Sequence, residues 1–121
     1  MKSTLLAAAF LLGAGIAAAH AEAKQDFTLV NKTGYELSEI YVSPSKANEW
    51  QDDVLGDDSL DDDESLNVHF ANSGKACMFD IKVVYTVDES SAIWHDIDLC
   101  ETSKVTIRYN RKSDTTSATF D

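Results

Sequence analysis

The sequence predicts an all-β protein: an antiparallel β-sandwich of six to seven short strands, with one short helical turn and one disulfide. Three observations lead to this fold class. Short runs rich in β-branched and aromatic residues alternate between apolar and polar positions. Clusters of Asn, Gly, Asp and Ser separate these runs at regular intervals, as turns do in sandwiches. Helical periodicity is almost absent.

Residues 1–21 have the pattern of a secretory signal peptide. Lys2 gives a positive start, residues 5–18 are apolar, and Ala19-His20-Ala21 supplies the small residues of a cleavage site. The apolar run is shorter than the about 20 residues of a membrane-spanning helix. We therefore expect a single mature domain of residues 22–121 that is periplasmic or secreted in a bacterium and has no membrane span.

The cysteines Cys77 and Cys100 are the only two in the chain, and both lie in the expected mature domain. Export leads to an oxidising compartment, so we expect them to form a disulfide. Closing this loop would contribute about 3.4 kcal/mol in the chain-entropy model. A domain of this size buries only about 60–65% of its unfolded surface, so such a cross-link matters. The weaker alternative is two buried free thiols.

The first strands are expected on either side of a tight turn. Residues 27–30 alternate as a strand, residues 31–34 (Asn-Lys-Thr-Gly) form the turn, and residues 35–43 form the second strand. The apolar positions of this second strand change parity near Ser38 and Glu39. That change predicts a β-bulge or burial on both faces.

The segment after the second strand is expected to hold the helical turn. Pro44 cannot donate to a strand ladder and suits the first position of a helix, with Ser43 as its cap. Residues 45–51 could then make one or two helical turns that present Trp50 to the core. Gly56 is expected to end the turn that follows.

Later strands are expected at residues 65–70, 77–87, 92–100, 105–109 and 115–120. The second and third of these form a hairpin whose simplest register sets the two cysteines opposite each other. The hydrophobic faces conflict with that register, because Ile97 and Leu99 have different parity from Cys100. A one-residue bulge, or a strand that ends before Cys100, would reconcile the two.

The sequence pattern of the chain resembles that of a family of small exported bacterial proteins of uncharacterised role. The matches are Leu29, Val30, Asn31, Thr33 and Gly34, then Ile40 to Ser45, then Trp50, Asp53, Leu55 and Gly56, and the two cysteines. The resemblance implies export and a β fold, and it transfers no catalytic residue. Such proteins sometimes carry an argininosuccinate lyase label, which a domain of roughly 100 residues is too small to support. They usually have a glycine before the third strand, where this chain has Asp63 and Glu64.

The charge of the chain restricts its partners. The formal net charge is −11, and it becomes −12 when Lys2 leaves with the signal peptide. Nucleic acid and anionic lipid are excluded, because binding them requires neutralising phosphates. A cationic protein surface or a divalent metal suits such a domain, and the oligomeric state is left open.

Nine acidic residues and no basic one lie between Glu49 and Glu64. Calcium prefers several carboxylate oxygens from one loop. The candidate ligands are Asp57, Asp58, Asp61 and Asp63. The loop lacks the Gly and the closing Glu of an EF-hand, and charge runs usually face solvent, so a solvated loop anchored by Leu55 and Leu60 is the favoured alternative.

Catalytic chemistry is the least favoured interpretation. His69 and His95 have no evident third ligand for zinc, and His95-Asp96 beside Ser90 and Ser91 lacks any motif that orders a triad. Six aromatic residues form either the core or a ligand-facing patch: Tyr35, Tyr41, Trp50, Tyr85, Trp94 and Tyr109. We therefore expect a non-enzymatic binding module without a cofactor that uses its acidic loop, with a Ca²⁺-binding or Ca²⁺-stabilised module as the alternative.

Overall fold

The structure, a computed structural model, describes residues 23–70 and 74–121. The expected signal peptide, residues 1–21, therefore lies outside the described residues. In the part that is described, no helix is long and apolar enough to cross a membrane. This part contains seven strands and no helix: β1 (Phe27–Lys32), β2 (Leu37–Pro44), β3 (Ser65–Val68), β4 (Met78–Tyr85), β5 (Ser91–Asp98), β6 (Lys104–Asn110) and β7 (Thr115–Phe120).

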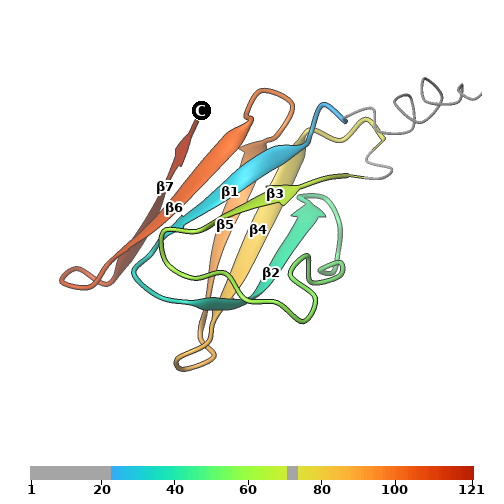
Figure 1. Ribbon diagram of the computed structural model, residues 1–121. Helices are drawn as coiled ribbons and strands as arrows, with labels where there is room; N and C mark the ends of the chain where they lie inside the picture. The colour runs from blue at the N-terminus through green and yellow to red at the C-terminus, as the bar shows by residue number, and fades with distance from the viewer. Residues whose placement is uncertain (1–22, 71–73) are drawn as a thin grey trace, which may run out of the picture.

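The strands form two sheets that face each other across one core (Figure 1). One sheet has the order β3-β1-β6-β7 and the other the order β2-β4-β5. Alternate residues of β1 and β4 point inward, and Leu29, Ile81 and Ile107 are completely buried. The expected all-β sandwich is confirmed.

One strand pair departs from the expected antiparallel arrangement. β1 and β6 run parallel, from the pair Thr28 and Lys104 to the pair Lys32 and Arg108, whereas every other strand pair is antiparallel. Strands joined by a short hairpin must be antiparallel, but a long connection permits either direction. Four strands lie between β1 and β6 in the chain, so the turn signals around each strand did not determine this pairing.

The expected helical turn at residues 45–51 is wrong, because this segment forms turns and bends only. β2 continues through Pro44, which lies opposite Phe79, and the Ser45 N–H then donates to the Met78 carbonyl at 2.9 Å. The Ser43 hydroxyl does not cap a helix but accepts the Gln51 N–H, eight residues along the chain. The chain is therefore held as a compact loop.

Trp50 is half-buried within this loop and does not join the cluster of buried core residues. Its ring packs against Tyr41 with 6.5 Å between centroids. The expectation that a helical turn would present Trp50 to the core is therefore corrected, since the side chain covers the outer face of β2 instead.

Both changes in hydrophobic parity correspond to bulges. The register of β2 against β4 shifts between Leu37 and Glu39, as the sequence predicts. On β5 the shift lies between Trp94 and Ile97, where Asp96 adopts a positive φ of 56°. β5 also ends at Asp98, so both of the features that could reconcile the hairpin are present.

The disulfide joins Cys77 to Cys100 with 5.1 Å between their Cα atoms, and the expected pairing is confirmed. The two cysteines lie just outside β4 and β5. The Leu99 N–H donates to the Cys77 carbonyl at 2.8 Å, which extends the ladder to the cross-link. The bridge thus closes the open end of the β4–β5 hairpin.

Replacing both cysteines with alanine should lower the free energy of unfolding by about 3 kcal/mol, because the unfolded chain regains the entropy of an open loop. Urea denaturation followed by tryptophan fluorescence measures this loss. The unchanged protein in reductant is the control and should lose the same amount. Equal midpoints with and without reductant would show that the cross-link does not constrain the unfolded chain.

Candidate functional site

The acidic loop, defined here as residues 49–64, connects β2 to β3 and remains largely in solvent. Eight of its nine carboxylates belong to exposed residues, and only Asp53 is half-buried. Leu55 and Leu60 are 7% and 4% exposed, so these two side chains anchor the loop as the sequence predicts. The loop therefore has a fixed apolar side and a charged outer side.

The acidic loop lies along the free edge of β2. Isolated bridges pair Leu60 with Leu37 and Asp53 with Tyr41. One Asp53 carboxylate oxygen accepts the N–H groups of Ile40 at 2.8 Å and Leu55 at 3.0 Å. These bonds occupy backbone groups that an edge strand would otherwise offer to another chain. The segment is thus a cover for the sheet edge.

The buried amide of Asn31 fixes the second half of the loop. Its NH₂ group donates to the carbonyls of Tyr35 at 2.9 Å and Leu60 at 3.1 Å. Its side-chain oxygen accepts the Thr33 N–H at 3.0 Å and the Thr33 hydroxyl at 2.7 Å. Asn31 is completely buried, and all four hydrogen-bonding positions of its amide are used. One side chain therefore joins the β1–β2 turn to the acidic loop.

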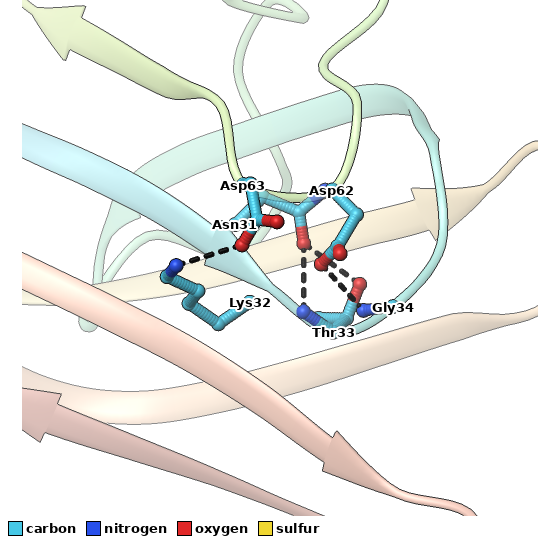
Figure 2. A network of polar contacts seen from close by, with 6 residues as sticks. All are labelled: Asn31, Lys32, Thr33, Gly34, Asp62 and Asp63. Atoms are coloured by element: carbon cyan, nitrogen blue, oxygen red, sulfur yellow. Dashed lines mark hydrogen bonds and ion pairs between the residues drawn. The ribbon is translucent and has the colours of Figure 1, made fainter.

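Asp62 and Asp63 add a second layer to this junction (Figure 2). An Asp62 carboxylate oxygen accepts the Gly34 N–H at 2.7 Å, and Asp63 forms an ion pair with Lys32 at 2.7 Å. The Asp63 N–H donates to the Asn31 carbonyl at 2.7 Å. Asp63 has a φ of 72°, the conformation that favours glycine. The turn before β3 therefore has a backbone conformation that glycine adopts without strain.

Asp61 shares a proton-dependent contact with Glu36. A hydrogen bond with Glu36, and then the charge of Glu64, raise the pKa of Asp61 above its ordinary value. Hydrogen bonds from Thr86 and Asp61 lower the pKa of Glu36. This contact connects the acidic loop to the residues that precede β2.

The four aspartates predicted to bind Ca²⁺ occupy different environments. Asp63 pairs with Lys32 and Asp61 lies beside Glu36, whereas Asp57 and Asp58 are exposed. Within residues 23–70 and 74–121, the one group of three potential ligands with atoms within 4.8 Å of one another is elsewhere. That group is Cys77, Asp98 and Cys100, and its sulfurs are joined in the disulfide. Calcium binding by the four aspartates stays a prediction without a gathered ligand set.

Two histidine–aspartate pairs lie on other parts of the sandwich. His69 is 3.2 Å from Asp26, and His95 is 3.1 Å from Asp80. His95 thus pairs with Asp80 on the neighbouring strand, whereas Asp96, beside it in the sequence, is exposed. Both imidazoles are largely exposed and both carboxylates are mostly covered.

The carboxylates of these two pairs hold backbone segments in place. Asp80 accepts the Asp96 N–H at the β5 bulge and the Ser45 hydroxyl. Burial raises the pKa of the Asp80 carboxyl, but the bonds from Ser45, Asp96 and His95 together hold it below its ordinary value. The pKa of Asp26 is lowered in the same way by Phe70, His69 and Ala23. These pairs act as structural clamps.

A pocket that the sequence did not reveal as such lies at one end of the sandwich. Its volume is about 590 Å³, and three of the six aromatic residues singled out in the sequence line it, namely Tyr35, Tyr85 and Tyr109. The sequence left open whether these rings form the core or a ligand-facing patch. Tyr85 does both, because it belongs to the buried core and also lines the pocket.

Acid should destabilise the protein through Asp26 and Asp80. Their folded pKa values lie below the ordinary value of 3.8, so each stabilises the fold above that pH and loses its contribution as pH falls further. The Asp26→Asn/Asp80→Asn double variant should show a flatter dependence of unfolding free energy on pH between 5 and 2. Urea denaturation at each pH measures it, and Asp57→Asn is the exposed control. Parallel curves for wild type and double variant would contradict this assignment.

Melting temperature should be the same in millimolar Ca²⁺ and in chelator, because the four aspartates are not gathered around one point. A ligand at 100 times its dissociation constant would add about 2.7 kcal/mol of stability, which calorimetry detects readily. An increase in melting temperature that disappears in the Asp57→Asn/Asp58→Asn variant would instead establish a calcium site.

No protein-family model, curated protein or solved structure matches this chain. The resemblance to small exported bacterial proteins therefore stays an expectation from the sequence. The function has to be inferred from the residues themselves.

Proposed function

We propose that this protein is an exported, non-enzymatic binding module whose acidic loop recognises a cationic protein surface. The observation that carries this proposal is the solvent exposure of eight carboxylates in a loop whose backbone is held at both ends. A fixed array of like charges is a pre-organised surface, because it loses little conformational freedom when a partner binds.

Electrostatics favours a basic partner over other partners. Lys32, paired with Asp63, is the one cation that forms a salt bridge to this loop among the described residues. The remaining carboxylates create a negative potential that attracts cationic surfaces and repels nucleic acid. Such attraction speeds association and weakens as salt is added.

An apolar groove beside the carboxylates adds a second recognition element. It has a volume of about 490 Å³ and is lined by Val54, Leu55, Leu60 and Leu66, with acidic side chains at Asp58 and Glu64. Val54 is 40% exposed, so part of this surface is open to a partner. Apolar and anionic groups side by side suit a polypeptide segment that carries both basic and apolar side chains.

Two features support export. The first 21 residues have the pattern of a signal peptide, and the disulfide belongs to proteins of oxidising compartments. The resemblance to exported bacterial proteins agrees with both. We therefore place the binding function in the periplasm or outside the cell.

Neutralising the loop should weaken binding of a basic amphipathic peptide of alternating lysine and leucine by at least tenfold at 50 mM salt. The test variant combines Asp57→Asn, Asp58→Asn, Asp61→Asn and Asp63→Asn. Fluorescence anisotropy of the labelled peptide gives the dissociation constant, and the difference between wild type and variant should shrink at 300 mM salt.

A matched control removes the same number of charges elsewhere, with Glu89→Gln, Asp96→Asn, Glu101→Gln and Asp121→Asn. These four residues are also exposed. The control should bind the peptide within about threefold of wild type, since it keeps the loop. Equal losses in both variants would mean that net charge alone attracts the peptide, and the loop would not be the recognition surface.

A further inference from the structure

The pocket at the end of the sandwich combines aromatic and acidic groups. It is lined by residues of the β4–β5 turn and the β6–β7 turn and by Tyr35, which precedes β2. The two turns lie at the same end of the sandwich (Figure 1). The pocket lining includes three tyrosines, two aspartates and a serine, namely Tyr35, Tyr85, Tyr109, Asp88, Asp114 and Ser90. Its volume of about 590 Å³ is within the range of small-molecule sites. We refer to it as the tyrosine pocket.

Three tyrosine rings form one connected wall. The ring centroid of Tyr35 lies 6.0 Å from that of Tyr85 and 6.1 Å from that of Tyr109. The centroids of Tyr85 and Tyr109 are 6.4 Å apart. The faces of aromatic rings carry partial negative charge and attract cations. The guanidinium of Arg111 already lies over the Tyr35 ring, 4.9 Å from its centroid. This contact shows that the cluster accepts a cation from the chain itself.

Two carboxylates are fixed at the pocket. An Asp114 oxygen accepts the Tyr109 hydroxyl at 2.7 Å, and an Asp88 oxygen accepts both the N–H and the hydroxyl of Ser90. The two hydrogen bonds from Ser90 hold the pKa of Asp88 below its ordinary value. The bond to Asp114 raises the pKa of Tyr109. The pocket therefore has two carboxylates with oriented oxygen atoms, and they outnumber the guanidinium of Arg111 at its wall.

Tyr85 leaves a hydrogen-bonding group unused. Its side chain is 8% exposed, and its buried hydroxyl has no hydrogen-bond partner in the described part of the chain. A buried polar group without a partner costs about 1–3 kcal/mol. A ligand that brings an N–H or O–H donor to this oxygen would recover part of that cost.

We propose that the tyrosine pocket binds a compact organic cation, an alkylammonium or guanidinium group. The tyrosine cluster, two carboxylates and an unpartnered phenol oxygen together match such a group in charge and hydrogen bonding. A neutral sugar would gain less, because it makes no use of the two negative charges. The cation can belong to a free small molecule or to a lysine or arginine side chain. This site uses none of the acidic-loop residues and goes beyond the function proposed above.

Titration calorimetry with choline and its neutral isostere 3,3-dimethyl-1-butanol tests the role of charge. We expect choline to bind at least tenfold more tightly than its neutral isostere. NMR spectra recorded with choline should show chemical-shift changes in the three tyrosine rings. Equal affinities, or tighter binding of glucose than of choline, would overturn the proposal. The same titration with a capped tripeptide containing one trimethyl-lysine identifies the source of the cation. Tighter binding of the tripeptide indicates a polypeptide ligand, tighter binding of choline a free one, and binding of neither sinks the site.

Two pocket variants and one control separate binding from folding. Asp114→Asn keeps an acceptor for Tyr109 and suits the positive φ of 53° at this position, yet removes one charge. Tyr35→Leu removes a ring face. Each should weaken choline binding at least fivefold, whereas Tyr41→Leu should leave it unchanged, although Tyr41 also has a cation, Lys82, over its ring. Equal losses in all three variants would overturn the assignment.

Tyr85→Phe gives the sharpest readout, because it removes a hydroxyl that makes no hydrogen bond in the free protein. The variant should be at least as stable as wild type, yet it should bind choline, whose hydroxyl can donate to the Tyr85 oxygen, at least threefold more weakly. Unchanged affinity would contradict the role of this hydroxyl in the site. The acidic-loop variants leave all the residues of the tyrosine pocket in place. Either proposal can therefore be contradicted while the other stands.

Discussion

The buried amide of Asn31 is the contact on which the arrangement of the acidic loop depends. It joins the carbonyl of Leu60 in the loop to the carbonyl of Tyr35 and the backbone of Thr33 in the β1–β2 turn. The backbone at the end of the loop is tied to Asn31 as well, through the Asp63 N–H and the Glu64 carbonyl. Removing the amide would leave several buried partners unsatisfied at once, each costing about 1–3 kcal/mol. The loop therefore has one conformation because uncharged groups hold it, and its carboxylates need not.

This separation of roles explains how so many like charges are tolerated. Asp53 and Asp62 serve the fold by accepting backbone N–H groups, while most of the other carboxylates of the loop lie in water. Exposed like charges repel each other only weakly at physiological salt, because solvent and ions screen them. The same segment covers the edge of β2, so the part of the chain that presents charge also blocks unwanted strand pairing.

Much of the fold was predictable because its signals are local. Strand positions, the bulge near Ser38, the anchors Leu55 and Leu60 and the disulfide all follow from periodicity, turn residues or compartment. Three features did not follow. The parallel pairing of β1 with β6 joins segments that are far apart in the sequence. Pro44 is the last residue of β2, opposite Phe79, and does not begin a helix. The tyrosine pocket brings together residues from three separate turns, and no spacing in the sequence records that convergence.

The two proposed cation-binding surfaces share the β1–β2 turn. Gly34 donates to Asp62 of the acidic loop, and Tyr35 follows it directly into the tyrosine pocket. Glu36 contacts Asp61 through its side chain, and its carbonyl accepts the Thr86 N–H near the β4–β5 turn. A basic polypeptide that crosses this turn would engage both surfaces, and the second contact would form at high effective concentration. Two sites joined by one turn would then bind such a polypeptide more tightly than either site binds a free small cation.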